Sequence, residues 1–482
     1  MELARRVAKN IMYRTLAQIV ANVSGLLVTI YLARVLKPEM FGVYSLAISI
    51  AMIAISVANL GIDGSISRYV AYFYSKGDIG QLRSYFWYFL KIKLYMVIPV
   101  CAALVLLSGH ISTLFGNPEL KLPIVFASFF VFSTTLSRSL NAFFSGLQKF
   151  EYVFIRQTVY EVSRWVFIFL LVAPLLASGA VLSNAIGRLV AFTVLLFFVL
   201  GSYRNYVFGS TSKVDKDARA FAGYMSVSQL GARIYSYIDI LMVGMLLSTT
   251  DAGYYRAAQN LIFIAAGMIA MSEVFLPLFS QLDGKDLENA FKRITRYTSV
   301  MSFPLTAAGI YFSAEIMSAI YGRDYLAASI PFSILSVALL LMAYNYLTAM
   351  LNAKGRPEIS AKIILLSILL NILLNYVLIT KIGIGGAAIA TVISRAFTIF
   401  TTSYFIFQIF SLKIDPTSIV KPFFCATTML AFLYLLPHPV NIITGILELT
   451  AGFVVYLILI FAIKGLEKDD LRYFASLLGL KS

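Results

Sequence analysis

Charged residues are scarce in this 482-residue chain. They make up 13% of the sequence, against 60% hydrophobic residues, and the mean hydropathy is +0.84. A soluble protein carries about 25% charged residues. The chain therefore lacks the polar surface that would coat a water-soluble globule, and lipid must be the solvent for most of it.

Residues that bind metals or form disulfides are equally few. The two cysteines, Cys101 and Cys425, fall in apolar segments, and the two histidines, His110 and His438, are far apart in the sequence. This excludes a disulfide framework and a zinc site, and no cofactor is expected. The net charge of +16 comes without a basic face that interleaves aromatic residues outside the apolar segments, so nucleic-acid binding is not expected.

Long apolar runs dominate the rest of the sequence. Runs of about 20 residues predict an all-α, polytopic membrane protein with about fourteen transmembrane helices and no soluble domain. Their approximate extents are 11–35, 41–64, 84–109, 122–146, 153–176, 180–201, 219–247, 252–279, 297–319, 327–351, 360–380, 384–410, 418–436 and 441–463. The first run is too long for the core of a signal peptide, so it is interpreted as a retained span.

The basic residues are distributed unevenly between the two ends of these spans. On the side that holds the N-terminus lie 27 of the 39 Lys and Arg, 6 lie on the opposite side, and 6 lie within spans. Positive residues mark cytoplasmic loops. The bias predicts a multi-pass protein of the cell membrane with both termini in the cytoplasm.

Three pairs of segments repeat at a nearly constant spacing. At a shift of 207 or 211 residues, 178–188 matches 385–395, 149–151 matches 356–358, and 36–47 matches 247–258. This shift equals six helices, so both copies have the same orientation in the membrane. The duplication predicts two pseudo-symmetric six-helix lobes, at 1–205 and 206–411, followed by two C-terminal helices and a cytoplasmic tail in 412–482.

Four motifs carry a family resemblance. They are "LARVLKPEMFGVYSLA" from Leu32, "ISRYVAYFYSKGD" from Ile66, "LNAKGRPEISAK" from Leu351 and "NILLNYVLITKIGIGGAAIATVIS" from Asn371. With them the chain resembles the polysaccharide flippases of the multidrug/oligosaccharidyl-lipid/polysaccharide exporter superfamily. The resemblance implies a carrier that moves lipid-diphosphate-linked oligosaccharide outward by alternating access for cell-surface glycan biosynthesis. Its implied partners are the polyprenyl-diphosphate-linked oligosaccharide, membrane lipids and glycan polymerase or transferase machinery.

Cations inside the spans are the candidates for binding the diphosphate headgroup. Each costs about 2.5–3.5 kcal/mol at a helix centre, so each should face a cavity or a partner. These candidates are Arg14, Arg138, Arg164, Arg188, Arg233 and Arg395. The acidic candidates inside spans are fewer, namely Asp63, Glu161, Asp239 and Glu273. The positive surplus predicts an anion site.

The six arginines differ in what else could explain them. Arg233 lies near the middle of its helix and is the strongest single candidate, with a buried ion pair between the lobes as the alternative. Arg188 and Arg395 are repeat-equivalent and could either hold one anion from both lobes or stabilise each lobe. Arg138 lies in the cytoplasmic half of its helix, where cargo would enter.

Two arginines have simpler explanations beside headgroup binding. Arg164 is three residues from Glu161 on one helical face, so the two can form an ion pair. Arg14 lies within one turn of the membrane edge and can extend its charge into the interface.

Carboxylates inside spans are typical sites for a coupling ion, H⁺ or Na⁺. Asp239, Asp63 and Glu273 are the candidates here. Asn371 and Asn375 are four residues apart on one helical face and predict hydrogen bonds to a neighbouring helix, and the small residues after them predict close helix packing.

Two other functions fit less well. A cation-coupled multidrug or toxin extruder has the same fold, but it would be expected to show the opposite charge balance. An enzyme acting on lipid-linked sugars would need a catalytic set, and Asp215-Lys-Asp217 lies in a short loop with no fold to present a nucleotide. The protein is therefore not expected to be an enzyme.

Overall fold

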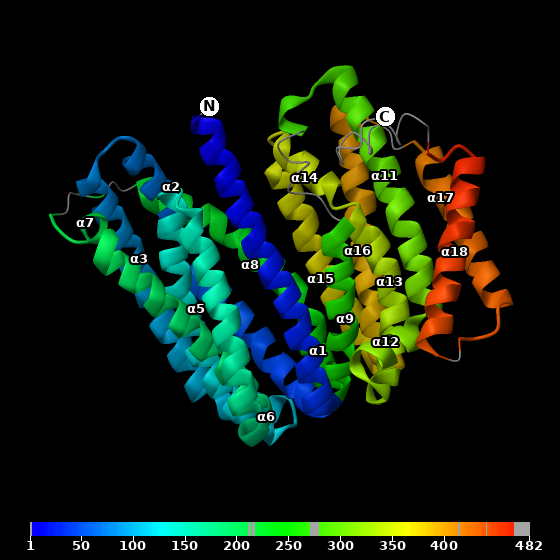
Figure 1. The fold of residues 1–482 in the computed structure, drawn as a ribbon, viewed down its shortest axis with the longest axis horizontal. Coiled ribbons are helices and arrows are strands. Elements are labelled where there is room, and N and C mark those ends of the chain that lie inside the picture. Colours follow the sequence, from blue (N-terminus) through cyan, green and yellow to red (C-terminus); the bar gives the residue numbers. More distant parts are fainter. Residues whose placement is uncertain are drawn as a thin grey trace. The chain divides into compact units, whose positions relative to one another are not determined.

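Helices joined by short turns make up the computed structural model (Figure 1). It describes residues 2–210, 214, 217–269, 279–412, 415–439 and 441–466, and no strand occurs among these residues. Nine helices in these ranges are long and apolar enough to cross a membrane, or ten if the bent pair α11 and α12 is one span. In lipid a helix satisfies all its own backbone groups, which explains this class. The all-α membrane fold is confirmed, and the number fourteen stays a prediction.

Two of the helices are too long to cross a bilayer once. α1 (Glu2–Asn59) has 58 residues and α6 (Phe150–Ser202) has 53. At 1.5 Å per residue each would extend about 80 Å, against a hydrocarbon core of about 30 Å. Non-helical backbone at Lys37 in α1 and at Leu176 in α6 divides each helix. Each therefore supplies two spans.

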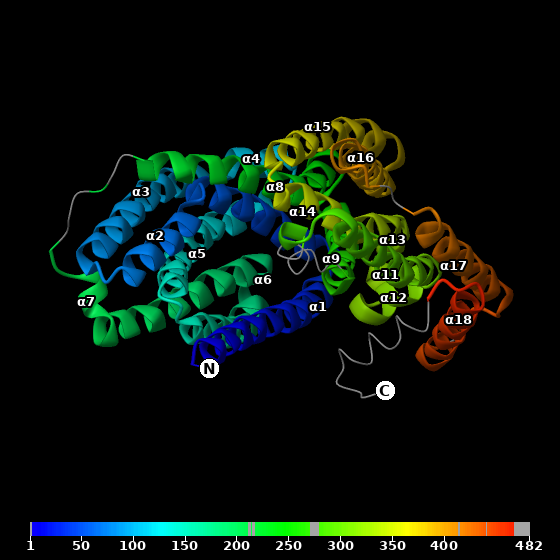
Figure 2. The ribbon, with the colours of Figure 1, turned by 90° about the horizontal axis from the view of Figure 1, so that it is seen from above.

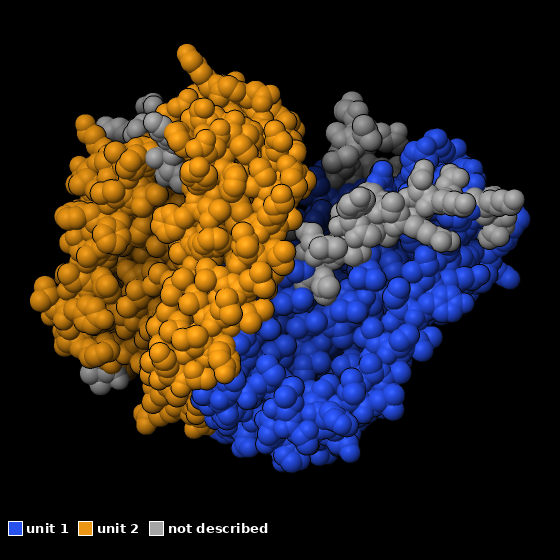
Figure 3. Space-filling model, turned by 180° about the vertical axis from the view of Figure 1, so that it is seen from behind, with its two compact units in different colours: residues 1–253 blue, residues 254–482 orange. Residues whose placement is uncertain are grey.

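Residues 1–253 form one compact unit, unit 1 (Figure 3). Within it α6 packs against α1 and α5, α3 packs against α5, and α8 packs against α1. An aromatic core that includes Phe86, Phe143 and Phe144 fills the space between α2, α3, α5 and α6. The other elements are α2 (Ile62–Ser75), α3 (Ile79–Leu106), α4 (Ser108–Leu114), η1 (Pro118–Leu120), α5 (Lys121–Gly146), α7 (Arg204–Val207) and α8 (Asp217–Leu246).

Residues 254–482 form the second compact unit, unit 2. α9 (Thr249–Ile269) crosses the boundary between the units. The remaining helices are α11 (Gly284–Tyr311), α12 (Ser313–Tyr321), η2 (Arg323–Ala328), α13 (Ser329–Ala343), α14 (Tyr346–Ala353), α15 (Pro357–Ile382), α16 (Ile384–Phe410), α17 (Thr417–Leu435) and α18 (Ile442–Ala462). α17 and α18 form a hairpin that packs mainly against α11 (Figures 1 and 2). The predicted lobe boundary at 205/206 follows the repeat, whereas these units follow packing, so the lobes stay a prediction.

The predicted duplication is visible in the backbone. Leu176, where α6 reverses, has φ 48° and ψ −127°, and its repeat-equivalent Gly383 has φ 64° and ψ −145°. Gln148 and its equivalent Gly355 both have positive φ, at 59° and 74°. Positive φ is costly for residues other than glycine. The same turn geometry therefore recurs at the 207-residue spacing, even where the first copy lacks glycine.

Side-chain and backbone contacts repeat in the same way. A Cβ atom on Gly179 would overlap the carbonyl oxygen of Leu171, and one on Gly386 would overlap the carbonyl oxygen of Leu378. The two contacts correspond, because Gly386 lies 207 residues after Gly179 and Leu378 lies 207 residues after Leu171. The small residues at these positions let two helices of a hairpin approach closely, as predicted.

Polar residues inside and apolar residues outside mark α15 as a membrane helix. Asn371 and Asn375 are 1% and 0% exposed, whereas Leu369 and Leu373 are exposed. The Asn375 amide donates to Oδ1 of Asn371 at 3.0 Å, and the Asn371 amide donates to Oγ of Ser394 on α16 at 3.3 Å. The predicted hydrogen bond to a neighbouring helix is confirmed for Asn371, whereas the Asn375 amide bonds to Asn371 within α15.

A pair of repeat-equivalent glycines forms a close contact within unit 1. A Cβ atom on Gly42 would overlap the carbonyl oxygen of Thr249, and one on Gly253 would overlap the carbonyl oxygen of Pro38. The amide of Asn117 donates to Oγ1 of Thr249 at 3.0 Å beside this contact. We call the contact of Gly42 and Gly253 the glycine seam; it joins the two copies of one repeated motif.

We expect Gly253→Ala to lower the melting temperature of the detergent-solubilised protein, because the added methyl group has no space against the Pro38 carbonyl. Gly267 in the same helix has nothing within 4 Å of a built Cβ, so Gly267→Ala should be neutral or stabilising by up to about 1 kcal/mol. Thermal unfolding of both variants checks this. Equal melting temperatures for the two variants would show that the seam is not tightly packed.

Candidate functional site

Two arginines of α6 converge on one tyrosine ring of the same helix. Because α6 reverses at Leu176, its second half returns along its first. The guanidinium carbon of Arg188 lies 3.4 Å from the centroid of the Tyr160 ring, and that of Arg164 lies 5.1 Å away. The Tyr160 hydroxyl donates to Oδ1 of Asn184 at 2.9 Å. The aromatic face thus stabilises two neighbouring cations that would otherwise repel each other.

Glu161 is the counter-ion at this position. It forms the predicted ion pair with Arg164, and both side chains are buried. The Ser24 hydroxyl on α1 donates to its Oε2 at 2.8 Å, and the Gln157 amide donates to its Oε1 at 2.8 Å. Both carboxylate oxygens are satisfied, which a buried charge requires.

Arg156 adds a third cation from the first half of α6. Its side chain is buried, with Nε donating to Oδ1 of Asn141 on α5 at 2.8 Å and Nη2 donating to Oε1 of Gln157 at 3.0 Å. No carboxylate lies within ion-pair distance of it among the described residues, while Arg188, Arg138 and the Asp63 carboxylate are near enough to interact with its charge. A buried cation that is bonded to neutral amides alone is suited to an incoming anion.

A second ionic group lies beside the first. α1 and α2 are separated by Leu60 and Gly61, both with positive φ, and this break places Asp63 in the first turn of α2. Asp63 forms an ion pair with Lys93 of α3, and its Oδ2 lies 3.9 Å from Nε of Arg138 on α5. The Lys93 side chain is buried, whereas that of Arg138 is 41% exposed.

These charges form one cationic cluster on α2, α3, α5 and α6, with an excess of three positive charges. Its members are the cations Lys93, Arg138, Arg156, Arg164 and Arg188 and the anions Asp63 and Glu161. Arginine holds phosphate oxygens in a bidentate geometry, and an anion with more than one charge balances such an excess. The arrangement can therefore bind a diphosphate or a comparable anion.

The second repeat does not conserve this chemistry. At a shift of 207 residues, Arg156 and Glu161 correspond to Ile363 and Ile368, and Arg164 corresponds to Asn371. Arg188 alone keeps its charge, as Arg395. The cationic cluster is therefore a property of the first copy.

The structure brings some of the predicted site residues together and leaves others outside the cluster. Arg138, Arg164, Arg188 and Asp63 come together in the cationic cluster, as described above. Of the remaining candidates, Arg14 and Arg233 have exposed side chains on α1 and α8, and Asp239 is buried on α8. Arg395 is partly buried on α16 and belongs to unit 2, and Glu273 lies outside the described residues. Arg233, the strongest candidate from the sequence, is thus an exposed residue that is not part of the cationic cluster.

Sequence reasoning missed Lys93 and Arg156. Arg156 lies three residues after the expected start of its span, where a cation is readily assigned to the membrane edge. A periodic stripe could have revealed it, since polar residues occur at 156, 157, 160, 161 and 164, all on one face of a helix. Lys93 had no comparable signal, because its partner Asp63 is 30 residues away.

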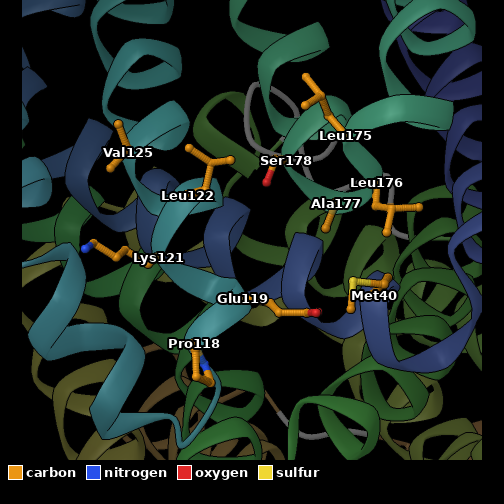
Figure 4. Close-up of a pocket in the computed structure, with 10 residues that line it drawn as sticks. All are labelled: Met40, Pro118, Glu119, Lys121, Leu122, Val125, Leu175, Leu176, Ala177 and Ser178. Atoms are coloured by element: carbon orange, nitrogen blue, oxygen red, sulfur yellow. The ribbon is translucent and has the colours of Figure 1, made fainter.

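A separate pocket of about 420 Å³ lies at the other end of unit 1, where α6 reverses (Figure 4). Its lining is mostly apolar, with Glu119 and Lys121 as the charged members. None of the cationic cluster residues lines it. The full lining is Met40, Pro118, Glu119, Lys121, Leu122, Val125, Leu175, Leu176, Ala177 and Ser178.

We expect Glu161→Gln to destabilise the protein by about 3 kcal/mol, because it leaves the buried Arg164 without its carboxylate. Glu151→Gln is the matched control, since Glu151 is on the same helix and lies 3.9 Å from Lys149 with both side chains about one-third exposed. Its cost should stay below about 1 kcal/mol. Thermal unfolding in detergent measures both, and a Glu161→Gln shift no larger than the control would contradict the assignment of a buried pair.

Known proteins share the sequence pattern and the fold of this chain. The model of the family described as "Polysaccharide biosynthesis protein" matches residues 7–283, more than half of the chain. A lipid II flippase MurJ in an inward closed conformation has the same fold, with a TM-score of 0.70 at 17% identity over 94% of this chain and 99% of that one. An inward-facing multidrug resistance transporter of the MATE family has a TM-score of 0.66 at 14% identity, over 83% and 98% of the two chains.

Curated relatives agree with this. A probable low-salt glycan biosynthesis flippase, Agl15 of Haloferax volcanii, is 25% identical over 42% of this chain, and the match spans 45% of that relative. A putative O-antigen transporter of Shigella flexneri is 23% identical over 75% of this chain and 88% of its own length. The lipopolysaccharide biosynthesis protein WzxC of Escherichia coli is 22% identical over 75% and 73%. By its sequence match over more than half its length, by its helical membrane fold and by these relatives, the chain belongs to the polysaccharide biosynthesis protein family.

Proposed function

We propose that this protein is a flippase that carries lipid-diphosphate-linked oligosaccharide from the cytoplasmic to the outer leaflet by alternating access. The observation that carries the proposal is the cationic cluster, with its excess of three positive charges inside a membrane-embedded unit. Isolated cations are expensive in lipid, so an excess is retained where an anion occupies it. The names of the curated relatives support a glycan cargo.

The position of the cationic cluster suits entry from the side of the N-terminus. Arg138 lies eight residues before the end of α5, and Arg156 lies six residues after the start of α6. At 1.5 Å per residue both are about 10 Å from the helix ends that lie on that side. The excess of basic residues there supports a cytoplasmic location of both termini. The headgroup would thus meet the arginines soon after leaving the cytoplasm.

The glycine seam lies on α1 and α9, on the side of unit 1 away from the N-terminus. It lies where α1 breaks at Lys37 and where α8 gives way to α9, and it joins the two copies of one motif. Release to the outside would require this contact to open while the cluster becomes closed to the cytoplasm. A ligand biases such a two-state element only by its different affinity for the two states.

A coupling ion, H⁺ or Na⁺, would give the cycle its direction. Lys93 already neutralises Asp63. Asp63 and the buried Asp239 of α8 are the candidate carboxylates for the coupling site among the described residues. The polymerase or transferase that consumes the flipped product would supply direction by removing it. No catalytic step is assigned to the flippase itself, and the positive excess disfavours the alternative of a cation extruder.

We expect Arg156→Met/Arg188→Met to slow flipping of a fluorescent polyprenyl-diphosphate oligosaccharide in proteoliposomes at least tenfold. Each arginine removed deletes a charge-assisted contact worth about 1.5–3 kcal/mol. Arg233→Met is the matched control, because it removes an exposed intramembrane arginine outside the cluster and should flip at the wild-type rate.

Three results would go against the proposal. Loss of flipping in Arg233→Met with normal flipping in the double variant would place the site on α8. A wild type that flips no lipid-linked sugar but moves an organic cation down a proton gradient would make the protein an extruder. Unchanged flipping in the double variant would remove the headgroup role of the cluster.

A further inference from the structure

Lys93 is a buried member of the cationic cluster to which the proposed transport cycle assigns no role of its own. It lies on α3, fourteen residues after the helix begins, and it is 1% exposed. Its ammonium group forms an ion pair with Asp63. A charge of this kind is retained in a membrane helix only where a partner or a function compensates its burial.

The two carboxylate oxygens of Asp63 face two different cations. Its Oδ1 takes the Lys93 ammonium group, while its Oδ2 stays 3.9 Å from Nε of Arg138, beyond hydrogen-bond distance. Asp63 is the one carboxylate within ion-pair distance of Arg138 among the described residues. Its position in the first turn of α2 also favours the negative charge, because the helix dipole is positive there.

Resting on the proposed function, we infer that Lys93 is a positioning residue for the headgroup site: it holds Asp63 away from Arg138 and so keeps Arg138 available to the diphosphate. Arg138 has the most exposed side chain of the three, at 41%, so it is the one an incoming anion can reach. Without Lys93, the Asp63 carboxylate would turn its charge to Arg138 and form an internal ion pair. The headgroup would then have to displace that carboxylate before binding.

This arrangement predicts opposite effects for the two members of one ion pair. Lys93→Met leaves Asp63 to occupy Arg138, so anion binding weakens. Asp63→Asn removes the internal competitor, so anion binding strengthens. Asp63→Asn leaves the buried Lys93 charge without its partner, and Lys93→Met removes the ion pair that fixes Asp63, so both single variants lose stability. A pair with a merely structural role would change binding in the same direction in both variants.

The test is binding of farnesyl diphosphate to the full-length protein in detergent, measured by isothermal titration calorimetry, with farnesol and inorganic diphosphate as separate arms. Relative to wild type we expect Lys93→Met to bind farnesyl diphosphate about tenfold more weakly and Asp63→Asn to bind it several-fold more tightly. The double variant Lys93→Met/Asp63→Asn should return to within about twofold of wild type. Arg138→Met should bind weakly, and adding Lys93→Met to it should change little.

The double variant keeps the test decisive. It carries no buried charge at either position, so its melting temperature should exceed that of both single variants and it remains measurable if one of them does not fold. Failure of the double variant to recover binding would overturn the inference and make Lys93 itself a ligand of the anion. So would weaker binding in Asp63→Asn.

The arms also separate this inference from the proposed function. Wild type that binds farnesyl diphosphate but not farnesol, with the expected order of variants, supports both. Equal affinity for inorganic diphosphate and farnesyl diphosphate would keep the role of Lys93 but identify a free anion as the ligand. Wild type that binds none of the three probes would remove the proposed headgroup site and the positioning role with it.

Discussion

The reversal of α6 at Leu176 is the constraint on which the cationic cluster depends. It brings Arg188 from the second half of the helix onto the ring of Tyr160 in the first half, beside Arg164. Leu176 adopts a backbone conformation that favours glycine, and its repeat-equivalent is Gly383. The surrounding packing therefore holds this turn in place, since nothing in the local preference of leucine selects it.

The duplicated fold is used unequally. Matching contacts persist in both copies: Tyr44 accepts from Asn184 at 3.4 Å in unit 1, and the equivalent Tyr255 and Thr391 are 3.1 Å apart in unit 2. Most of the charged side chains do not persist, because isoleucine replaces Arg156 and Glu161 and asparagine replaces Arg164 in the second copy. Both copies share the helix packing, but only the first copy carries the charged cluster. Under the proposed function, the first copy would bind the headgroup and the second would take part in the conformational change alone.

Two kinds of ion pair have different physical roles in the cationic cluster. Glu161 is fully hydrogen-bonded and fixes Arg164. Asp63 is shared unequally between Lys93 and Arg138, and this inequality leaves a cation within reach of a ligand. An anion site in lipid needs both kinds of ion pair. Some carboxylates must offset the cost of burying the cations while the site is empty, but at least one cation must stay available to the ligand.

Composition and periodicity alone determined the membrane class and the helical architecture, and they predicted the duplication. These follow from the cost of unsatisfied backbone in lipid and from patterns that repeat along the chain. The i, i+3 pair of Glu161 and Arg164 was predictable as well, because both residues lie on one helical turn. Only the tertiary structure decided which arginines converge: it grouped Arg138, Arg164 and Arg188, added Lys93 and Arg156, and left Arg233 exposed. The reason is that the rotation of each helix and the exact break in α6 set which faces meet, and these are fixed by packing between residues far apart in the chain.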